Sequence, residues 1–403
     1  MSAIDMRSAL RKSVAFLSSI ELGIASLVLL MILVVLCTLD QVNIGTFGAV
    51  EKYFRSFFLY GRLPLAGWRV PVFPGGALVG GLLLANVTAS AVARFQLRLS
   101  KTGVWMIHLG LMLLILGEFV TGVFSVETQM AIEEGASRDY SESPRRAELV
   151  VIDGSEAAHD KVFSVGESSL REGREFHHPA WPFSLRVAAY FSNSAIGRRP
   201  DSDALPPSRA DRGAGRDLVV RPLARAARDD VRNQPAAFVE LLAEGRSLGT
   251  WLVGSALGRL ETFSHEGRTY ALGMRPLRRH MPFTLTLKDF RHDVYPGTEI
   301  PKNFSSRVRL THPEKGEARD VLIYMNHPLR YLGRTFYQAS YGKNDTLSVL
   351  QVVENPGWLL PYIAFIMMAL GLAFQFTFHL LRFRPAGAKG AVEPDAARSR
   401  GGR

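Results

Sequence analysis

The sequence predicts a membrane protein with four transmembrane α-helices and a large all-β extracytoplasmic domain inserted between the third and fourth helices. Long apolar blocks are separated by very polar stretches, so the 47% of hydrophobic residues in this 403-residue chain are unevenly distributed. Between the last two blocks, short runs of alternating apolar and polar residues are bounded by Gly, Pro and Asn. Such alternation is typical of half-buried strands, whereas the blocks are long enough for helices that cross a bilayer.

Each apolar block has a distinguishing residue. The first carries one charge, Glu21, and is too long for the apolar core of a signal peptide, so we expect a retained helix. The second contains Gly76 and Gly80, a spacing that allows close contact with another helix. The third contains His108, and the fourth ends in the basic sequence LLRFR. The predicted spans are residues 16–39, 70–93, 103–124 and 358–383.

Clusters of basic residues predict the orientation of the helices. They lie before the first helix, between the second and third, and after the fourth, so a four-span topology brings them to one side of the membrane. The positive-inside rule assigns this side to the cytoplasm, together with residues 1–15, 94–102 and a disordered tail at 384–403. The clusters are Arg7, Arg11 and Lys12, then Arg94, Arg98 and Lys101, and finally Arg382 and Arg384.

The same rule places residues 40–69 and 125–357 in the periplasm of a bacterium, and the chain in its inner membrane. The loop at 40–69 has scattered basic residues, and we expect its segment EKYFRSFFLY to form an amphipathic helix at the membrane interface. Since membrane topology accounts for most of the net charge of +11, no nucleic-acid partner is expected.

The periplasmic segment is expected to fold as an antiparallel sandwich or barrel. The sequence Pro182-Phe-Ser-Leu-Arg-Val is echoed by Pro282-Phe-Thr-Leu-Thr-Leu, which indicates a duplicated strand pattern. Between the two copies, residues 192–234 are rich in Arg, Asp, Pro and Ser with little periodicity, so we expect a flexible loop there. The clearest predicted strands are residues 183–190, 283–290, 306–310, 321–324 and 346–353.

Several classes of chemistry are excluded by the sequence. The single cysteine, Cys37, leaves no disulfide, no CxxC redox pair and no CxxCH haem-attachment motif. No GxSxG, phosphate-binding loop or dinucleotide fingerprint occurs. The periplasmic histidines lack metal-site spacing, so we expect each to be a surface residue. They are His159, His177, His178, His265, His280, His292, His312 and His327.

The run MNHPLRYLGRTFYQASY at 325–341, followed by VVENPGW at 352–358, is similar to the ResB (CcsB) family of system II cytochrome c biogenesis proteins. The segment DFRHDVYPGTEIPKNFSSRVRL, the amino-terminal LGIASL, the TLDQ that follows it and the region of Asn86 also fit the family pattern. Cys37 stands where the family commonly has glycine. The chain lacks the tryptophan-rich WWD segment, the haem-handling signature of the partner CcsA, so it resembles the stand-alone ResB subunit.

The resemblance implies a role in cytochrome c maturation. ResB and CcsA together carry haem across the membrane and promote its attachment to the CxxCH motifs of apocytochrome c. The resemblance also implies that a transmembrane histidine ligates haem b in transit. His108 is the only matching position, and the metal that it would bind is the haem iron. One imidazole leaves the second axial position open, so we expect the site to be shared with the partner. Whether such a subunit is non-catalytic or co-catalytic in haem ligation stays open.

Helical periodicity around His108 agrees with this role. At about 100° per residue, Trp105 and Met112 share its face and would line a bound haem. At about 1.5 Å per residue, His108 would lie about 8 to 10 Å from the cytoplasmic edge. A histidine in such a helix can instead simply hydrogen-bond to the next helix. Three glycines lie opposite His108 and would let a neighbouring helix approach closely, namely Gly103, Gly110 and Gly117.

Two other histidines are secondary candidates. His379, near the cytoplasmic end of the fourth span, is expected to reach the lipid headgroups, with haem entry as the alternative. His327, in the NHPLR turn, is expected to make a structural hydrogen bond, with contact to haem or apocytochrome as the alternative. A second function also stays open, in which the chain is a haem-free membrane scaffold whose periplasmic domain positions apocytochrome for the partner.

Overall fold

The chain divides into two compact units. The helical unit comprises Met1–Leu36, Lys52–Phe124 and Pro356–Arg403, and the strand unit comprises Cys37–Glu51 and Ser125–Asn355. Most of the predicted amino-terminal tail and the whole carboxy-terminal tail lie outside the described residues. The computed structural model describes residues 12–62, 68–94, 96, 98–156, 159–199, 208–226, 231–298, 301–342 and 345–382.

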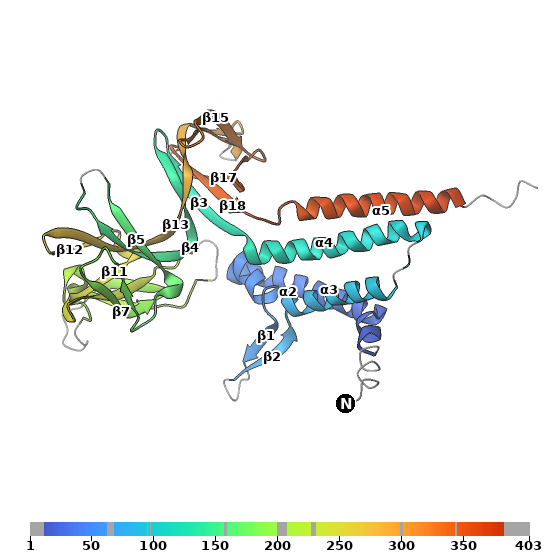
Figure 1. Ribbon diagram of the computed structural model, residues 1–403, viewed down its shortest axis with the longest axis horizontal. Coiled ribbons are helices and arrows are strands. Elements are labelled where there is room, and N and C mark those ends of the chain that lie inside the picture. Colours follow the sequence, from blue (N-terminus) through green and yellow to red (C-terminus); the bar gives the residue numbers. More distant parts are fainter. Residues whose placement is uncertain are drawn as a thin grey trace, which may run out of the picture. The chain divides into compact units, whose positions relative to one another are not determined.

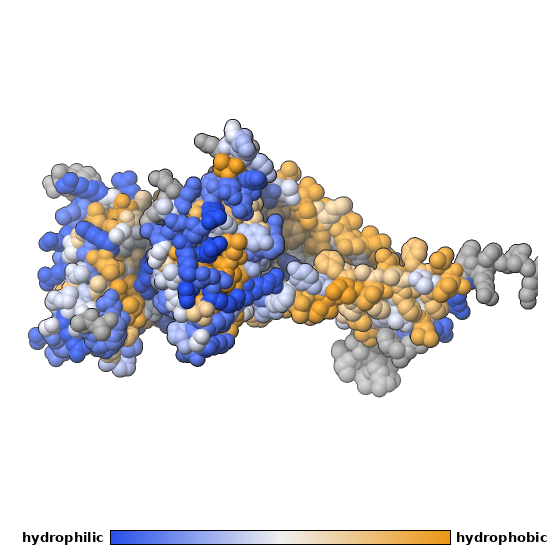
Figure 2. All heavy atoms as spheres, turned by 90° about the horizontal axis from the view of Figure 1, so that it is seen from above, coloured by the Kyte–Doolittle hydropathy of each residue, from blue (hydrophilic) through white to orange (hydrophobic). Residues whose placement is uncertain are grey.

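Four of the described helices are long and apolar enough to cross a membrane, in agreement with the prediction. Apolar side chains are exposed around these helices, and hydrophobic residues cover them in Figure 2. A helix that is apolar on all sides needs an apolar environment, which a bilayer provides. The helices are α2 (Ile20–Tyr53), α3 (Gly76–Ala93), α4 (Thr102–Phe124, after a 3-10 turn at Leu99–Lys101) and α5 (Leu360–Arg382) (Figure 1).

Helix α2 extends beyond the predicted first span. It continues to Tyr53 through a kink at Gly45, where φ is 74° and ψ is 166°. Residues Cys37–Glu51 belong to the strand unit, in which the Arg145 guanidinium lies 3.6 Å from the centroid of the Phe47 ring. Glycine permits this positive φ without steric cost, so the helix can change direction at this point.

The predicted interfacial helix at 51–60 is divided between the end of α2 and a β-hairpin, and this hairpin also takes the place of the start of the second span. Strand β1 (Phe58–Arg62) pairs antiparallel with β2 (Arg69–Pro74), and α3 begins only at Gly76. Pro71 and Pro74 account for the late start of α3, because proline lacks the backbone N–H and holds the preceding residue in an extended conformation.

The strand unit consists of antiparallel strands arranged in two lobes. The strands from β3 to β18 follow α4 and precede α5 in the chain. The long strands β4 (Ser137–Asp153) and β13 (Arg268–Val294) pair with each other, and β13 contributes to both lobe cores. Each predicted strand is confirmed. The strands of the first lobe are β5 (Lys161–Gly166), β6 (Glu175–His177), β7 (Ser184–Phe191), β10 (Ala236–Ala243), β11 (Arg246–Gly254) and β12 (Glu261–His265); those of the second lobe are β3 (Val126–Glu133), β14 (Pro301–His312), β15 (Glu317–Tyr324), β16 (Leu329–Tyr331), β17 (Arg334–Gly342) and β18 (Leu347–Glu354).

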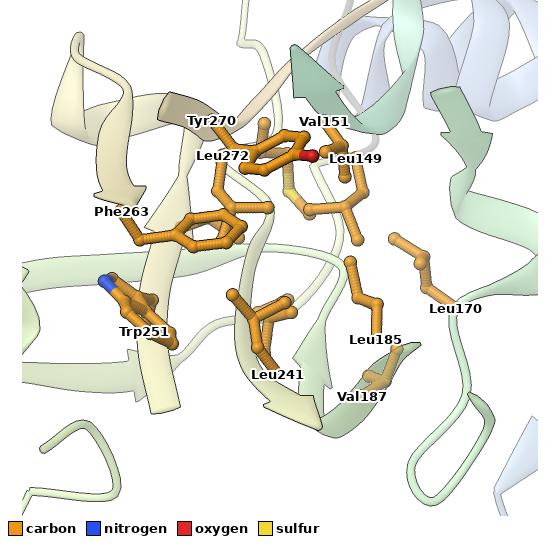
Figure 3. Packing of buried hydrophobic residues seen from close by; sticks show 14 of the residues in the cluster. Leu149, Val151, Leu170, Leu185, Val187, Leu241, Trp251, Phe263, Tyr270 and Leu272 are labelled. Carbon is orange, nitrogen blue, oxygen red and sulfur yellow. The ribbon is translucent and has the colours of Figure 1, made fainter. Parts of the chain in front are cut away.

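The echoed sequences lie at the start of β7 and in the middle of β13, and each contributes to the core of one lobe. In the first lobe, Phe183 and Leu185 are buried in an aromatic and aliphatic core, part of which is shown in Figure 3. In the second lobe, Phe283 and Leu285 take the same positions in a separate core. Alternate residues therefore point inward in both copies, as a period of two requires.

The predicted loop at 192–234 contains regular structure among its described residues. Strand β8 (Ser194–Arg198) pairs antiparallel with β9 (Leu218–Pro222). Asn193 holds the base of this hairpin, because its amide donates to the Ala224 carbonyl at 2.6 Å and its Oδ1 accepts from the Gln234 N–H at 2.9 Å. The pairing joins residues far apart in sequence, and the local polar composition does not reveal it.

Candidate functional site

His108 lies on α4 with one ring nitrogen engaged and the other free. Its Nδ1 lies 2.8 Å from the carbonyl oxygen of Val104, one turn earlier in the same helix. A carbonyl only accepts hydrogen bonds, so Nδ1 carries the proton and Nε2 keeps its lone pair. In the described part of the chain, Nε2 has no hydrogen-bond partner. This arrangement is the one that metal-ligating histidines use, with the second nitrogen held by a backbone carbonyl.

The glycine stripe opposite His108 packs directly on α5, which confirms the prediction of a close helix contact. A Cβ on Gly103 would lie 2.5 Å from the Gly371 carbonyl oxygen, and one on Gly110 would lie 2.9 Å from the Ala364 carbonyl oxygen. A Cβ on Gly117 would lie 2.9 Å from the Cβ of Leu360. Because α5 covers this face, the half-buried His108 side chain points to the side that α5 leaves uncovered.

The contact with α5 also fixes the level of His108 along the helix pair. His108 lies between the glycines that face Gly371 and Ala364, so it is level with the segment between these two residues. That segment is about 6 to 17 Å from the start of α5 at Leu360 and about 17 to 27 Å from its end at Arg382. Measured along α5, His108 is therefore farther from the helix end at Arg382 than from the helix start at Leu360.

The two predicted lining residues differ in their contacts. The indole N–H of Trp105 donates to the Gln96 carbonyl at 3.3 Å, which ties the first turn of α4 to the connection from α3. Met112 is half-buried on the same side of α4 as His108. Trp105 therefore has a positioning role in the structure, and its ring and the Met112 thioether flank the imidazole by helical spacing.

His379 is exposed near the end of α5 and hydrogen-bonds within its own helix. Its Nε2 accepts from the Gln375 amide at 2.7 Å, one turn earlier. Gln375 packs against Gly103, and its Oε1 is buried with no hydrogen-bond partner among the described residues. His379 lies eight residues, or about 12 Å, beyond Gly371 along α5, so it belongs to a different level from His108.

His327 lies at the end of a tight turn between β15 and β16. Its backbone N–H donates to the Tyr324 carbonyl at 2.9 Å, and its ring stacks on Tyr324 with centroids 4.2 Å apart. Asn326 adopts a φ of 64°, a left-handed conformation that asparagine tolerates. The predicted structural hydrogen bond is present, but the backbone of His327 makes it, while the exposed imidazole stacks.

Residues of the amino-terminal and second-span motifs meet just before α2, where residues 18 and 19 interrupt the helical run that begins at residue 12. The Asn86 amide donates to the carbonyls of Leu17 and Ser19, each at 2.7 Å. Its Oδ1 occupies space that a side chain at Gly23 would fill, since a Cβ there would lie 2.9 Å away. Asn86 is buried, and it satisfies carbonyls that the helix break leaves without helical partners.

The carboxy-terminal motifs form a buried polar network in the second lobe. The Ser306 hydroxyl, 0% exposed, donates to Gln338 Oε1 at 2.6 Å and lies 2.7 Å from the Ser348 hydroxyl. Outside this network, the Tyr331 hydroxyl donates to Glu317 at 2.6 Å; this bond lowers the pKa of Glu317 and raises that of Tyr331. These motif residues therefore hold strands together, and every polar group named in the network has a partner.

Two histidines of the strand unit contradict the prediction of surface residues. His312 is 2% exposed, and only 9% of the His292 side chain is exposed. The pairing of β13 with β14 shifts register between Leu287 and Asp289, so the inward positions change from odd to even numbers. Phe290 and His292 therefore face inward. The apolar Phe290 two residues before His292 is the sequence signal that could have revealed this change.

Residues 259–349, which contain β12 to β17 and the start of β18, match the ResB-like family. The chain is 33% identical over 113 residues to Protein NrfI of Wolinella succinogenes, which covers 28% of this chain and 12% of that protein. It is 34% identical over 107 residues to the cytochrome c biogenesis protein CcsB of Prochlorococcus marinus strain MIT 9313, which covers 27% of this chain and 24% of that protein. For the cytochrome c biogenesis protein CcsB of Synechococcus sp. strain CC9311 the identity is 34% over 119 residues, which covers 28% of this chain and 26% of that protein.

The matches to these relatives span about a quarter of their length or less. The matched family segment contains the turn of His327 and the Ser306–Gln338–Ser348 network, and it ends before α5. The resemblance predicted from the sequence is thereby confirmed, and residues 259–349 of the chain are similar to the ResB-like family.

Proposed function

We propose that this chain is a membrane subunit of cytochrome c biogenesis that carries haem across the bacterial inner membrane and assists its covalent attachment to apocytochrome c. The names of the similar CcsB proteins support the cytochrome c biogenesis role. In this proposal haem is the substrate, and a CcsA-type membrane protein is the partner that completes the system II synthase.

The observation that carries the proposal is the state of His108. The Val104 carbonyl holds Nδ1–H, which leaves the Nε2 lone pair available to haem iron in a helix otherwise composed largely of apolar residues. An uncommitted imidazole is costly in hydrocarbon and therefore marks a functional position. A second ligand from the partner would complete the axial coordination of the iron.

His108→Ala tests this role when the chain is co-expressed with its CcsA-type partner and a c-type cytochrome. We expect the purified complex to lose most of its haem absorbance and covalent haem attachment to fall in parallel. Added imidazole should restore haem binding, because it can occupy the space left by the histidine ring and supply the same nitrogen. Gly122→Ala on the same helix is the matched control, since no atom lies within 4 Å of a Cβ there.

Retention of wild-type haem and full cytochrome assembly in His108→Ala would reject the proposal. If removing the strand unit abolished maturation while His108→Ala did not, the chain would instead act as a haem-free scaffold that positions apocytochrome. The rescue by imidazole separates loss of a ligand from loss of packing, because packing defects do not respond to a free nitrogen base.

The proposal includes a topology with cytoplasmic ends and a periplasmic strand unit. The basic connection between α3 and α4, with Arg94, Arg98 and Lys101, supports this orientation. Reporter fusions would measure it, with alkaline phosphatase active after residue 230 and inactive after residue 98. The reverse pattern would place the strand unit in the cytoplasm and contradict this part of the proposal.

A further inference from the structure

The β1–β2 hairpin of the helical unit is a two-stranded sheet that packs closely on the start of α3. Among the described residues no third strand pairs with it. The Gly75 N–H donates to the Phe57 carbonyl at 2.8 Å, and the Ala77 N–H donates to the Ser56 carbonyl at 3.3 Å. A Cβ on Gly75 would overlap the Ser56 carbonyl oxygen, so this close approach requires glycine. The base of the hairpin is therefore fixed to one end of a helix that can cross a membrane.

The outer face of this hairpin carries large aromatic side chains. Phe58 and Tyr60 are two residues apart on β1, so they share a face, whereas Leu59 and its cross-strand neighbour Phe73 take the other. Leu59 is buried, but Tyr60 is 61% exposed, and Trp68, one residue before β2, is 73% exposed. Two strands alone are at best marginally stable in water, and exposed apolar rings add no stability there. The exposed face therefore calls for an environment less polar than water.

The segment that contains the hairpin is basic and has no acidic residue. Residues 52–75 include no Asp or Glu, and their basic residues are Lys52, Arg55, Arg62 and Arg69. The exposed Arg69 has no ion pair or hydrogen bond among the described residues, and the same holds for the Tyr60 hydroxyl. Indole and phenol rings are enriched where acyl chains meet headgroups, and long basic side chains extend from that level to the phosphates.

We propose that the β1–β2 hairpin binds the lipid surface, with Phe58, Tyr60 and Trp68 at the boundary between acyl chains and headgroups and Arg69 on anionic phosphates. Lipid is the occupant that fits best, because only one residue separates β2 from α3 and the charge of the segment complements anionic headgroups. Figure 1 shows the hairpin projecting sideways from the start of α3, across the direction of that helix, as an element that lies along a membrane surface does. The inference depends neither on haem nor on which side of the membrane carries the hairpin.

The test measures the environment of a fluorescent label on the full-length chain in nanodiscs. Cys37→Ala removes the single cysteine, and Phe58→Cys then carries a nitrobenzoxadiazole label. We expect blue-shifted emission, protection from aqueous iodide, and at least about twofold quenching by phospholipids brominated near the top of the acyl chains. Val162→Cys on β5 is the matched control, because Val162 is 45% exposed and Phe58 is 42% exposed. Its label should stay accessible to iodide, and Tyr60→Cys should repeat the hairpin result with Phe58 in place.

The contribution of charge is measured by the lipid composition. Raising phosphatidylglycerol from none to about one third of the lipid, in phosphatidylcholine, should increase the quenching by brominated lipid. Arg69→Gln should reduce this increase by about half, whereas Arg246→Gln, an equal loss of charge at an exposed position of the strand unit, should not change it.

Two results would overturn the inference. Free access of iodide to both hairpin labels, with no quenching by brominated lipid, would place the hairpin in water. Protection from iodide without quenching by brominated lipid would mean that protein, such as a second copy of the chain, covers the hairpin. Since the chain is measured without a partner and without haem, failure of the proposed function would leave these results unchanged.

Discussion

Replacing Gly103 with alanine should weaken the packing of α4 on α5. The added Cβ would lie 2.5 Å from the Gly371 carbonyl oxygen and 2.8 Å from the Gln375 backbone nitrogen, whereas ordinary contact begins near 3.4 Å. Two of the groups it meets belong to the backbone, so side-chain rotation cannot relieve the overlap. The helices must separate locally by about 0.9 Å, the difference between ordinary contact and the shortest distance.

The expected magnitude follows from two opposing terms. Overpacking of this kind costs about 1 to 3 kcal/mol, and alanine gains about 1 kcal/mol over glycine in helix propensity. Gly103→Ala should therefore lower the free energy of unfolding by up to about 2 kcal/mol. At Gly122 no atom lies within 4 Å of the added Cβ, so Gly122→Ala has the gain in helix propensity without the cost of overpacking. The difference between the two variants, about 1 to 3 kcal/mol, isolates the steric term.

Thermal unfolding of the detergent-purified chain, followed by circular dichroism at 222 nm, would compare these variants. The midpoint should fall in the order Gly122→Ala, wild type, Gly103→Ala. Gly371→Ala should behave like Gly103→Ala, because its Cβ would lie 2.8 Å from the Gly103 carbonyl oxygen. If Gly103→Ala were as stable as Gly122→Ala, the close α4–α5 contact and the level it assigns to His108 would both be wrong.

Three further predictions concern polar groups. Tyr270→Phe should stabilise the first lobe by about 1 to 3 kcal/mol, because the Tyr270 hydroxyl is buried without a described partner among apolar side chains (Figure 3); a lower unfolding midpoint would contradict this. Asn86→Leu should lower the midpoint by leaving two carbonyls unpaired, at a cost of about 1 to 3 kcal/mol, and an unchanged midpoint would argue against the bonds. The Ser155 hydroxyl lowers the pKa of Asp153, so the ionised Asp153 stabilises the fold above its ordinary pKa of 3.8, and this stabilisation disappears as pH falls through the lower folded pKa. The free energies of unfolding of wild type and Asp153→Asn, measured from pH 2 to 7, should therefore converge at the acid end. A difference between them that stays constant with pH would refute this prediction.

Local patterns predicted the parts of this fold that depend on local geometry. The seven-residue spacing from Gly103 to Gly117 repeats on one face of a helix, so it identified the surface that α5 covers without any knowledge of α5. The alternation around Phe283 likewise predicted an inward-facing strand. Both patterns are read within a single element, where the backbone period alone decides which side chains share a face.

The features that the sequence did not reveal depend on pairing between distant segments. The hairpin of β8 and β9 joins residues separated by a polar tract, and the β1–β2 hairpin replaces the expected interfacial helix. The orientation of His292 depends on a register shift that exists only because β14 pairs with β13. A one-residue shift moves every later side chain to the other face, so a strand that is correctly predicted can still carry a wrong prediction for its last residues.

The candidate site and the matched segment occupy different parts of the chain. Residues 259–349 supply Ser306 and Gln338, which satisfy each other inside the second lobe and leave no free polar group in that network. His108 lies outside this segment, and its free Nε2 is explained by no structural contact in the described residues. His292 combines both properties, because it lies within the segment and yet keeps an unused nitrogen. Since stable folding favours satisfied polar groups, an unpaired buried group such as the Tyr270 hydroxyl, Gln375 Oε1 or His292 Nε2 lowers stability and does not by itself identify a functional position.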